Sequence, residues 1–336
     1  RSHPTPSGDI VYKAYNQKLM SETTPYHIPA LLPQCLEAMQ VHPGGTYIDC
    51  TLGGGGHSRA IAAVAGPAGR LLCFDQDLDA IGRARDDEAL AAGQVQLVHS
   101  NFRFIRNFAR YYGVDGKVDG ILADLGVSFH HFDDPERGFS FRWPEGPLDM
   151  RMNRDGRLTA ADIVNTRDEE ELARILRLYG ELSQGRRLAA AIVRARSASP
   201  LLTAEQLLDA IAPVINPRQR KKELAQVFQA LRIEVNDEIG ALRALLEGAV
   251  RVLRPGGRLC VITYHSLEDR LVKNFMRTGN TDGRQDKDFF GRTSSPLRCL
   301  TSRPVVPDEA EVEANPRSRS AKMRCAEKVT PDNTDK

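Results

Sequence analysis

Four consecutive glycines, at positions 53–56, lie between a short apolar segment and a helical one, and they constrain the fold more than any other feature. Residues 46–50 are predicted to end a buried strand, and residues 57–65 to form a helix. Glycines at a strand-to-helix turn let backbone N–H groups approach a ligand that a Cβ atom would exclude. Considered alone, the run also fits an ordinary flexible loop. The function of the loop therefore depends on what surrounds it.

The spacing of these glycines departs from the dinucleotide-binding pattern G-x-G-x-x-G. Counted from Gly53, the third glycine of that pattern would be residue 58, where the chain has Ser58. The loop is therefore a poor match to a dehydrogenase and suits a nucleoside cofactor that lacks a pyrophosphate, with S-adenosylmethionine as the leading candidate. An NAD-dependent oxidoreductase built on the same kind of sheet remains a less favoured alternative.

Strand and helix patterns alternate around the loop. Strands are predicted at residues 46–50, 70–75, 95–99 and 118–123, and helices at 57–65, 77–90 and 104–111. The strands are nearly continuous apolar runs, which indicates a parallel sheet covered on both faces. In such sheets, ligands bind beyond the carboxyl ends of the strands.

Each of these four strands ends in residues that suit a cofactor site. The first ends at Asp49 and the glycines, the second at Asp75, the third just before Phe102, and the fourth at Asp124. An acid after the second strand commonly binds ribose hydroxyls. A single acid at a strand end is usually a turn or cap residue, but four such ends in succession favour a nucleoside-binding site.

The alternation stops after the fourth strand. Residues 129–157 combine glycines, aromatics and charges and are predicted to form a structured loop, while residues 159–224 show helical periodicity. Residues 137–232 contain 17 Lys and Arg against 12 Asp and Glu, so this segment carries a net charge of +5 and the remainder −3. A basic middle segment is compatible with a nucleic-acid substrate, although a solvated helical surface explains the same charge.

The strand pattern returns after residue 224. A long amphipathic helix is predicted at residues 225–253, a fifth strand at 258–264 and another helix at 267–277. Two final strands are predicted at residues 297–301 and 322–327. His265 follows the fifth strand, where a structural cap and a substrate contact are equally plausible roles. Ser266 with Asp269 three residues later resembles a capping box.

Composition limits the class of protein. With 41% hydrophobic and 27% charged residues, the chain has the balance of a globular protein. No run of about 18 apolar residues is present, so no membrane partner is predicted. The six cysteines form no C-x-x-C pair, which disfavours a metal site and fits a reducing cytoplasm. Residues 1–22 are polar and are predicted to be a disordered extension.

Seven blocks of sequence together resemble the RsmH (MraW) family of S-adenosylmethionine-dependent methyltransferases, which act on the N4 atom of a cytidine in the decoding region of 16S ribosomal RNA. The resemblance extends from about residue 26 to residue 327. The blocks are TLGGGGHS (51–58), DLGVS (124–128), ERGFSFR (136–142), GPLDMRM (146–152), FQALRIEVN (228–236), HSLEDR (265–270) and NPRSRSAK (315–322).

This resemblance implies an α/β fold of the class I methyltransferase type, Rossmann-like, with a seven-stranded, mostly parallel sheet and an inserted all-helical domain. With the extension 1–22 outside the resemblance, the expected divisions are a first part of the methyltransferase domain at 23–133, a helical RNA-recognition insert at 134–224 and a second part at 225–336. The cofactor contacts that the resemblance implies are Gly55, Gly56, His57, Asp75, Phe102, Asp124 and His131. Similar proteins often have Gln at position 131, so His131 departs from the family pattern.

Methyl transfer to an exocyclic amine needs close alignment and an acceptor for the hydrogens of the amine. Asp124 is predicted to lie between the cofactor and the target amine and is the candidate catalytic residue. The candidates for the RNA side are Asp149, Arg151, His265 and Glu268. A Pro-Cys motif, which methylation at carbon 5 would need, is absent from the sequence, so transfer to nitrogen is favoured. The expected partner is 16S rRNA or the small ribosomal subunit, and the alternative from another class is a non-catalytic RNA-binding assembly factor.

Overall fold

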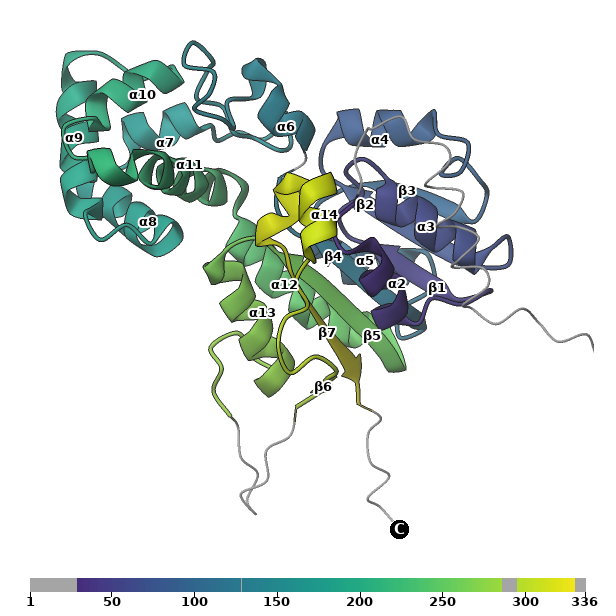
Figure 1. The fold of residues 1–336 in the computed structure, drawn as a ribbon. Helices are drawn as coiled ribbons and strands as arrows, with labels where there is room; N and C mark the ends of the chain where they lie inside the picture. Colours follow the sequence, from purple (N-terminus) through teal and green to yellow (C-terminus); the bar gives the residue numbers. More distant parts are fainter. Residues whose placement is uncertain (1–28, 128, 286–294, 330–336) are drawn as a thin grey trace, which may run out of the picture. The chain divides into compact units, whose positions relative to one another are not determined.

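The computed structural model describes residues 29–127, 129–285 and 295–329, so the predicted extension over residues 1–22 lies outside it. The chain forms two compact units (Figure 1). The first unit combines the chain up to Gly126 with the chain from Ala241 onward, and the second unit is Val127–Gly240. The sequence-based boundaries at 133/134 and 224/225 both fall inside the second unit.

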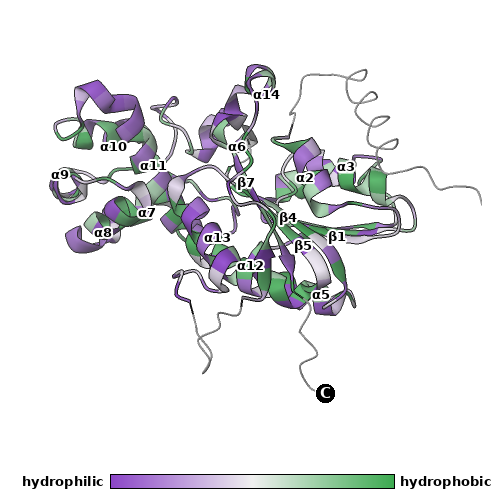
Figure 2. Cartoon of the chain, turned by 60° about the horizontal axis from the view of Figure 1, so that its bottom comes forward, coloured by the Kyte–Doolittle hydropathy of each residue, from purple (hydrophilic) through white to green (hydrophobic). Residues whose placement is uncertain are grey.

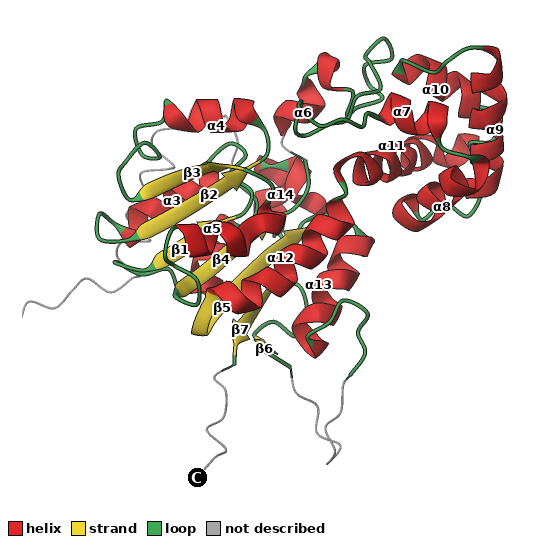
Figure 3. Ribbon diagram, turned by 180° about the vertical axis from the view of Figure 1, so that it is seen from behind, coloured by secondary structure: helices red, strands yellow, loops and turns green. Residues whose placement is uncertain are grey.

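Within the described residues, the first unit is built on a seven-stranded sheet in the order β3-β2-β1-β4-β5-β7-β6 (Figure 3). The strands are β1 (Thr46–Asp49), β2 (Arg70–Asp75), β3 (Val95–His99), β4 (Val118–Asp124), β5 (Leu253–Thr263), β6 (Leu297–Cys299) and β7 (Lys322–Lys328). The first five strands pair in parallel, and β7 is antiparallel to both β5 and β6. The predicted parallel sheet is therefore confirmed.

Helices cover both faces of this sheet. Figure 2 shows α2 and α3 on one face, with α5, α12 and α13 on the other. The helices of the first unit are α2 (Leu32–Met39), α3 (Gly56–Ala65), α4 (Leu78–Arg85), α5 (Ile105–Tyr111), α12 (Glu238–Val252, whose first three residues belong to the second unit), α13 (Ser266–Thr278) and α14 (Glu309–Ala314). Residues 71–74 of β2 are fully buried, as expected for a strand covered on both sides.

In the described residues, the regular elements of the second unit are helices, with loops and an isolated bridge between Pro147 and Thr203. Its helices are α6 (Phe129–Asp133), α7 (Ala160–Thr166), α8 (Glu169–Gly180), α9 (Gly185–Ala198), α10 (Ala204–Ile211) and α11 (Arg220–Asn236). Leu172, Ile175 and Leu176 of α8 pack in one core with Leu188 and Ile192 of α9. The helical periodicity predicted over residues 159–224 is thus confirmed for α8 and α9, whose apolar faces lie in a core of the second unit.

The prediction of one continuous helix over residues 225–253 is wrong. The structure has two helices, α11 and α12, which are separated at Asp237. Asp237 has φ 46°, a left-handed conformation that ends the first helix. The apolar positions continue on both sides of the break, so periodicity alone does not reveal it. The fifth strand also begins at Leu253, five residues earlier than predicted, because Leu253 pairs with Val118 across a register shift.

None of the helices in the described residues has the length and apolar character needed to cross a bilayer.

Candidate active site

The glycine loop joins β1 to α3 at the carboxyl edge of the sheet. Gly55 precedes α3 with φ 77°, and a Cβ atom there would lie 2.7 Å from Cδ1 of Leu90. Positive φ and this close approach both favour glycine. The next turn carries His57 and Ser58, which are both buried.

Asp75, at the end of β2, is bonded directly to this loop. The backbone N–H of Gly53 donates to Oδ2 of Asp75 at 2.9 Å, and the N–H of Asp77 donates to Oδ1 at 2.9 Å. Because β1 and β2 are parallel neighbours, their ends meet at one edge of the sheet. The structure thus brings the glycine loop and the predicted ribose acid together.

Phe102 lies at the end of the neighbouring strand. It begins a 3₁₀ turn over Phe102–Phe104 that follows β3, and it is half-buried. The side-chain amide of Asn101 donates to Oε1 of Gln76 at 3.0 Å. The ends of β2 and β3 are therefore held side by side, and Phe102 belongs to the same edge as Asp75.

A fully buried carboxylate, Asp49, lies beneath the loop. Its Oδ2 accepts from the hydroxyl of Ser58 at 2.6 Å, and its Oδ1 accepts from the N–H of Thr51 at 3.0 Å. The hydroxyl of Thr51 in turn accepts from the N–H of Asp124 at 2.7 Å. Sequence reasoning used Ser58 only as a missing glycine and did not identify Thr51. The sequence could have indicated Ser58 and Thr51, because each is a polar residue at a position that is expected to be buried.

Asp124 ends β4, and its side chain is 22% exposed. Its Oδ1 accepts from the hydroxyl of Tyr264 at 2.8 Å, and its Oδ2 lies 3.8 Å from Nδ1 of His57. Burial raises the pKa of Asp124 to about 6, and the neighbouring His57 and the bond from Tyr264 partly offset this rise. A carboxyl whose pKa lies near neutrality is suited to accept or share a proton. Tyr264, which sequence reasoning missed, follows β5 directly.

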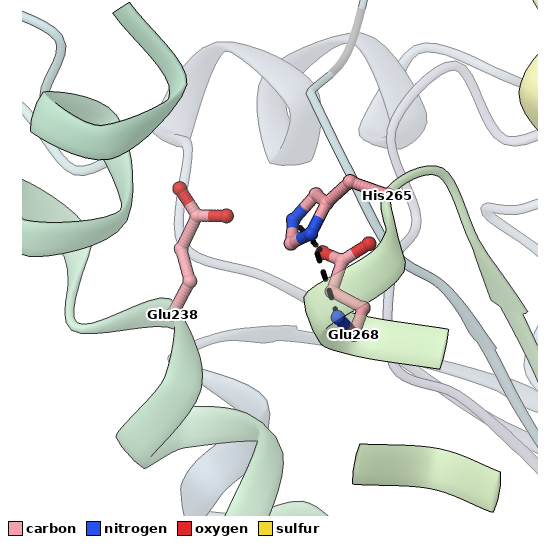
Figure 4. Close-up of side chains that lie close together, drawn as sticks. All are labelled: Glu238, His265 and Glu268. Atoms are coloured by element: carbon pink, nitrogen blue, oxygen red, sulfur yellow. Dashed lines mark hydrogen bonds and ion pairs between the residues drawn. The ribbon is translucent and has the colours of Figure 1, made fainter. Parts of the chain in front are cut away.

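His265 and Glu268 lie at the start of α13 (Figure 4). Nδ1 of His265 accepts from the N–H of Glu268 at 3.4 Å, so His265, and not Ser266, caps the helix. The predicted capping box is therefore wrong by one residue, because the chain turns helical at Ser266 itself. Nε2 of His265 lies 3.1 Å from Oε1 of Glu268, whose side chain is 5% exposed.

Three predicted site residues belong to the second unit. His131 in α6 is buried and stacks on Phe139, with ring centroids 4.8 Å apart. Arg151 makes a two-pronged ion pair with Asp149, through Nε to Oδ1 at 2.9 Å and Nη2 to Oδ2 at 2.7 Å. Its Nη1 donates to the carbonyl of Gly156 at 2.7 Å. Asp149 and Arg151 therefore organise their own loop.

The donor set of the first unit fits a cationic nucleoside better than an anionic one. Asp49, Asp75 and Asp124 all lie at the carboxyl ends of adjacent strands, and Arg59, in the first turns of α3, donates to Asp87 at 2.8 Å. Acids at this edge would repel a pyrophosphate and attract a sulfonium. This site, on parallel strands completed by an antiparallel β7, defines a class I methyltransferase that uses S-adenosylmethionine.

Comparison with known proteins gives the family. Residues 24–329 match the model of the MraW methylase family, and the chain belongs to this family. It is 56% identical to ribosomal RNA small subunit methyltransferase H of Bacteroides thetaiotaomicron over 303 residues, 90% of this chain and 97% of the relative. The proteins of the same name from Bacteroides fragilis and Flavobacterium johnsoniae are 54% and 46% identical over 310 residues, 92% of this chain and 100% of each relative.

Proposed function

We propose that this protein methylates the N4 atom of a cytidine in the decoding region of 16S rRNA, acting in the cytoplasm on the rRNA or on the small ribosomal subunit. The names of the relatives, at 46% to 56% identity over nearly their whole length, support ribosomal RNA of the small subunit as the substrate. The structural observation that carries the proposal is the half-buried Asp124 at the carboxyl edge of the sheet, beside the glycine loop and its bonded acid Asp75.

Asp75 is proposed to bind the ribose of the cofactor. Its Oδ2 accepts the backbone N–H of Gly53 and its Oδ1 accepts that of Asp77, so the carboxylate is fixed at the carboxyl edge of the sheet beside the glycine loop, where ribose acids commonly lie. Gly55, Gly56 and His57 are proposed to line the same site, with Phe102 as an apolar wall. His131 is retained as a proposed cofactor contact because the resemblance implies a contact at this position, although this chain has His where similar proteins often have Gln.

Asp124 is proposed to act on the target amine. When bound, S-adenosylmethionine supplies an electrophilic methyl group and leaves as a neutral thioether. The N4 amine is a poor nucleophile because its lone pair is delocalised into the ring, so a carboxylate that accepts a hydrogen bond from N4–H would improve it. As the new C–N bond forms, the nitrogen becomes cationic and loses one proton, for which the Asp124 carboxylate is the proposed acceptor.

The RNA-side candidates are proposed to act mainly by shaping loops. Arg151 and Asp149 bond to each other, and Glu268 bonds within the turn that begins α13. Substitutions at these positions are therefore expected to weaken substrate binding by loosening their loops. The target cytidine is expected to be presented unstacked, as base-modifying enzymes generally require.

Methyl transfer to purified small subunits and to naked 16S rRNA tests the proposal, with both taken from a strain that lacks this enzyme. Mass spectrometry should place one methyl group on N4 of a decoding-region cytidine. Asp124→Asn should lower the rate by about 100-fold or more, whereas the exposed Asp86→Asn should leave it unchanged.

Calorimetry with S-adenosylmethionine separates the alternatives. No binding would favour a non-catalytic assembly factor, and displacement of the cofactor by NAD would favour an oxidoreductase. Binding without methylation of either RNA substrate would show that the proposed substrate is wrong.

A further inference from the structure

Tyr264 approaches Asp124 from the adjacent strand. Asp124 lies opposite Ile262 in the parallel pairing of β4 with β5, so Tyr264 follows two residues further along. Its hydroxyl donates to Oδ1 of Asp124 at 2.8 Å. The ring packs on Gly126, where a Cβ atom would lie 3.0 Å from Cδ2 of Tyr264. The two strand ends are therefore shaped to let the phenol reach the carboxylate.

The backbone of Tyr264 is also held in place. Its N–H donates to Oε2 of Glu268 at 3.1 Å, and Glu268 is 3% exposed. Nε2 of His265 lies 3.1 Å from the other oxygen of Glu268. Because this tyrosine is fixed at its backbone and at its hydroxyl, it is suited to hold the Asp124 carboxylate in one orientation.

The other oxygen of Asp124 lies near His57. Nε2 of His57 lies 3.0 Å from the carbonyl oxygen of Ala30, which can only accept, so Nε2 carries the proton. Nδ1, the other ring nitrogen of His57, lies 3.8 Å from Oδ2 of Asp124. His57 lowers the pKa of Asp124, as the hydrogen bond from Tyr264 does, so both neighbours favour the ionised carboxylate.

We propose that Tyr264 is a positioning residue for methyl transfer, which orients Asp124 through Oδ1, leaves Oδ2 for the target amine and keeps the carboxyl ionised at neutral pH. This inference rests on the proposed role of Asp124. The other charged groups that face Asp124 are His57 from α3, Asp49 from β1 and Glu268 from α13; the two acids oppose its ionisation. The hydrogen bond from Tyr264 therefore favours the ionised Asp124 carboxylate, whereas burial and two like charges disfavour it.

Tyr264→Phe tests this inference, since it removes only the hydroxyl. Single-turnover methylation with saturating cofactor is measured from about pH 5.5 to about pH 9. Without the hydrogen bond, the acid limb of the rate profile should move to higher pH. The rate should fall about fivefold to tenfold relative to wild type at about pH 6 and recover to within about threefold at about pH 8.5.

Tyr47→Phe is the matched control, because Tyr47 is a buried tyrosine of β1 whose hydroxyl bonds to His42. Its acid limb should coincide with that of wild type. A Tyr264→Phe profile that drops uniformly without moving, or that matches wild type, would overturn the inference. Absence of methylation by the wild-type protein would instead count against the proposed function.

Two further measurements do not depend on RNA. Carbon-13 NMR of labelled aspartate carboxyls should show the Asp124 titration at higher pH in Tyr264→Phe than in wild type, and an unchanged titration would contradict the inference. If Tyr264→Phe does not fold, 3-fluorotyrosine at position 264, a stronger donor, should move the titration to lower pH. No movement in that protein would also overturn the inference.

Discussion

At the scale of single residues, the site holds a carboxyl group that is costly to ionise. Burial raises the pKa of Asp124 to about 6, well above the value of an exposed aspartate. The folded state therefore binds a proton that the unfolded state releases as the pH rises from about 4 to about 6. The stabilising contribution of Asp124 is fully present at low pH and is lost across this window.

Asp124→Asn is accordingly expected to stabilise the protein at neutral pH while it slows methyl transfer. The gain should be about 2 kcal/mol at about pH 7.5 and close to zero at about pH 4. Thermal unfolding of variant and wild type at both pH values measures the difference. If variant and wild type differed in stability by the same amount at both pH values, ionisation of Asp124 would not destabilise the folded protein, and the prediction would be wrong.

Sequence reasoning found Asp75 and Asp124 because their positions directly after strands are visible in the chain. It could not find what bonds to them. The hydroxyl of Thr51 accepts a hydrogen bond from the N–H of Asp124, and the hydroxyl of Tyr264 donates one to its carboxylate. These two partners are 73 and 140 residues away along the chain. Ser58 was counted as a departure from a pattern, although its hydroxyl holds the buried Asp49. Such pairings depend on strand order, which local spacing does not contain.

At the scale of secondary-structure elements, the ends of β4 and β5 must approach closely for the site to form. Gly126, two residues after β4, has φ 122° and contacts the ring of Tyr264. Both conditions exclude a larger residue, since a side chain at this φ is strained and its Cβ would press on the ring. The turn after β4 therefore contributes to the geometry of Asp124.

Gly126→Ala should lower the free energy of unfolding by about 1–3 kcal/mol and reduce methyl transfer, with the larger loss at low pH because Tyr264 is displaced. Gly82→Ala is the matched control: Gly82 lies within α4, and nothing stands within 4 Å of its ideal Cβ position. In this control, the free energy of unfolding should rise by about 0.5–1 kcal/mol, because Ala favours the helix more than Gly does. Denaturant unfolding and the rate profile measure both effects, and equal behaviour of the two variants would contradict the argument.

The predicted elements agree best where the signal is local. The bounds of β2 and β3 are as predicted, because each is an apolar run between turn residues. The break at Asp237 escaped prediction because its left-handed conformation has no glycine to mark it. The early start of β5 also escaped, since Pro255 and the glycines after it are typical of a turn and not of a paired strand.

At the scale of the whole molecule, the fold class was predictable from the alternation of strands and helices. The helical insert was predictable from the point where this alternation stops. The basic run Arg218–Lys222 lies on the second unit, and Arg218, Arg220, Lys221 and Lys222 are all exposed. Exposed cations bind RNA phosphates with an affinity that falls with salt. We propose that this run contributes to RNA binding.

The double variant Lys221→Gln, Lys222→Gln should weaken RNA binding and lower the slope of log K against log salt by about 0.7 per lysine if the contacted strand is single. Lys273→Gln, an exposed lysine of α13 in the first unit, is the control and should leave the slope unchanged. Filter binding at several salt concentrations measures both. A slope that does not change in the double variant would remove this run from the interface.

The order of the strands has a consequence for synthesis on the ribosome. β4 is flanked in the finished sheet by β1 and β5, and Leu253, which begins β5, is translated 129 residues after the end of β4 at Asp124. A nascent chain that has completed β1–β4 therefore leaves one edge of β4 without its neighbour while all of the second unit emerges. Because that unit has its own apolar core, it is expected to fold first, and the methyltransferase sheet closes only after the last third of the chain has been made.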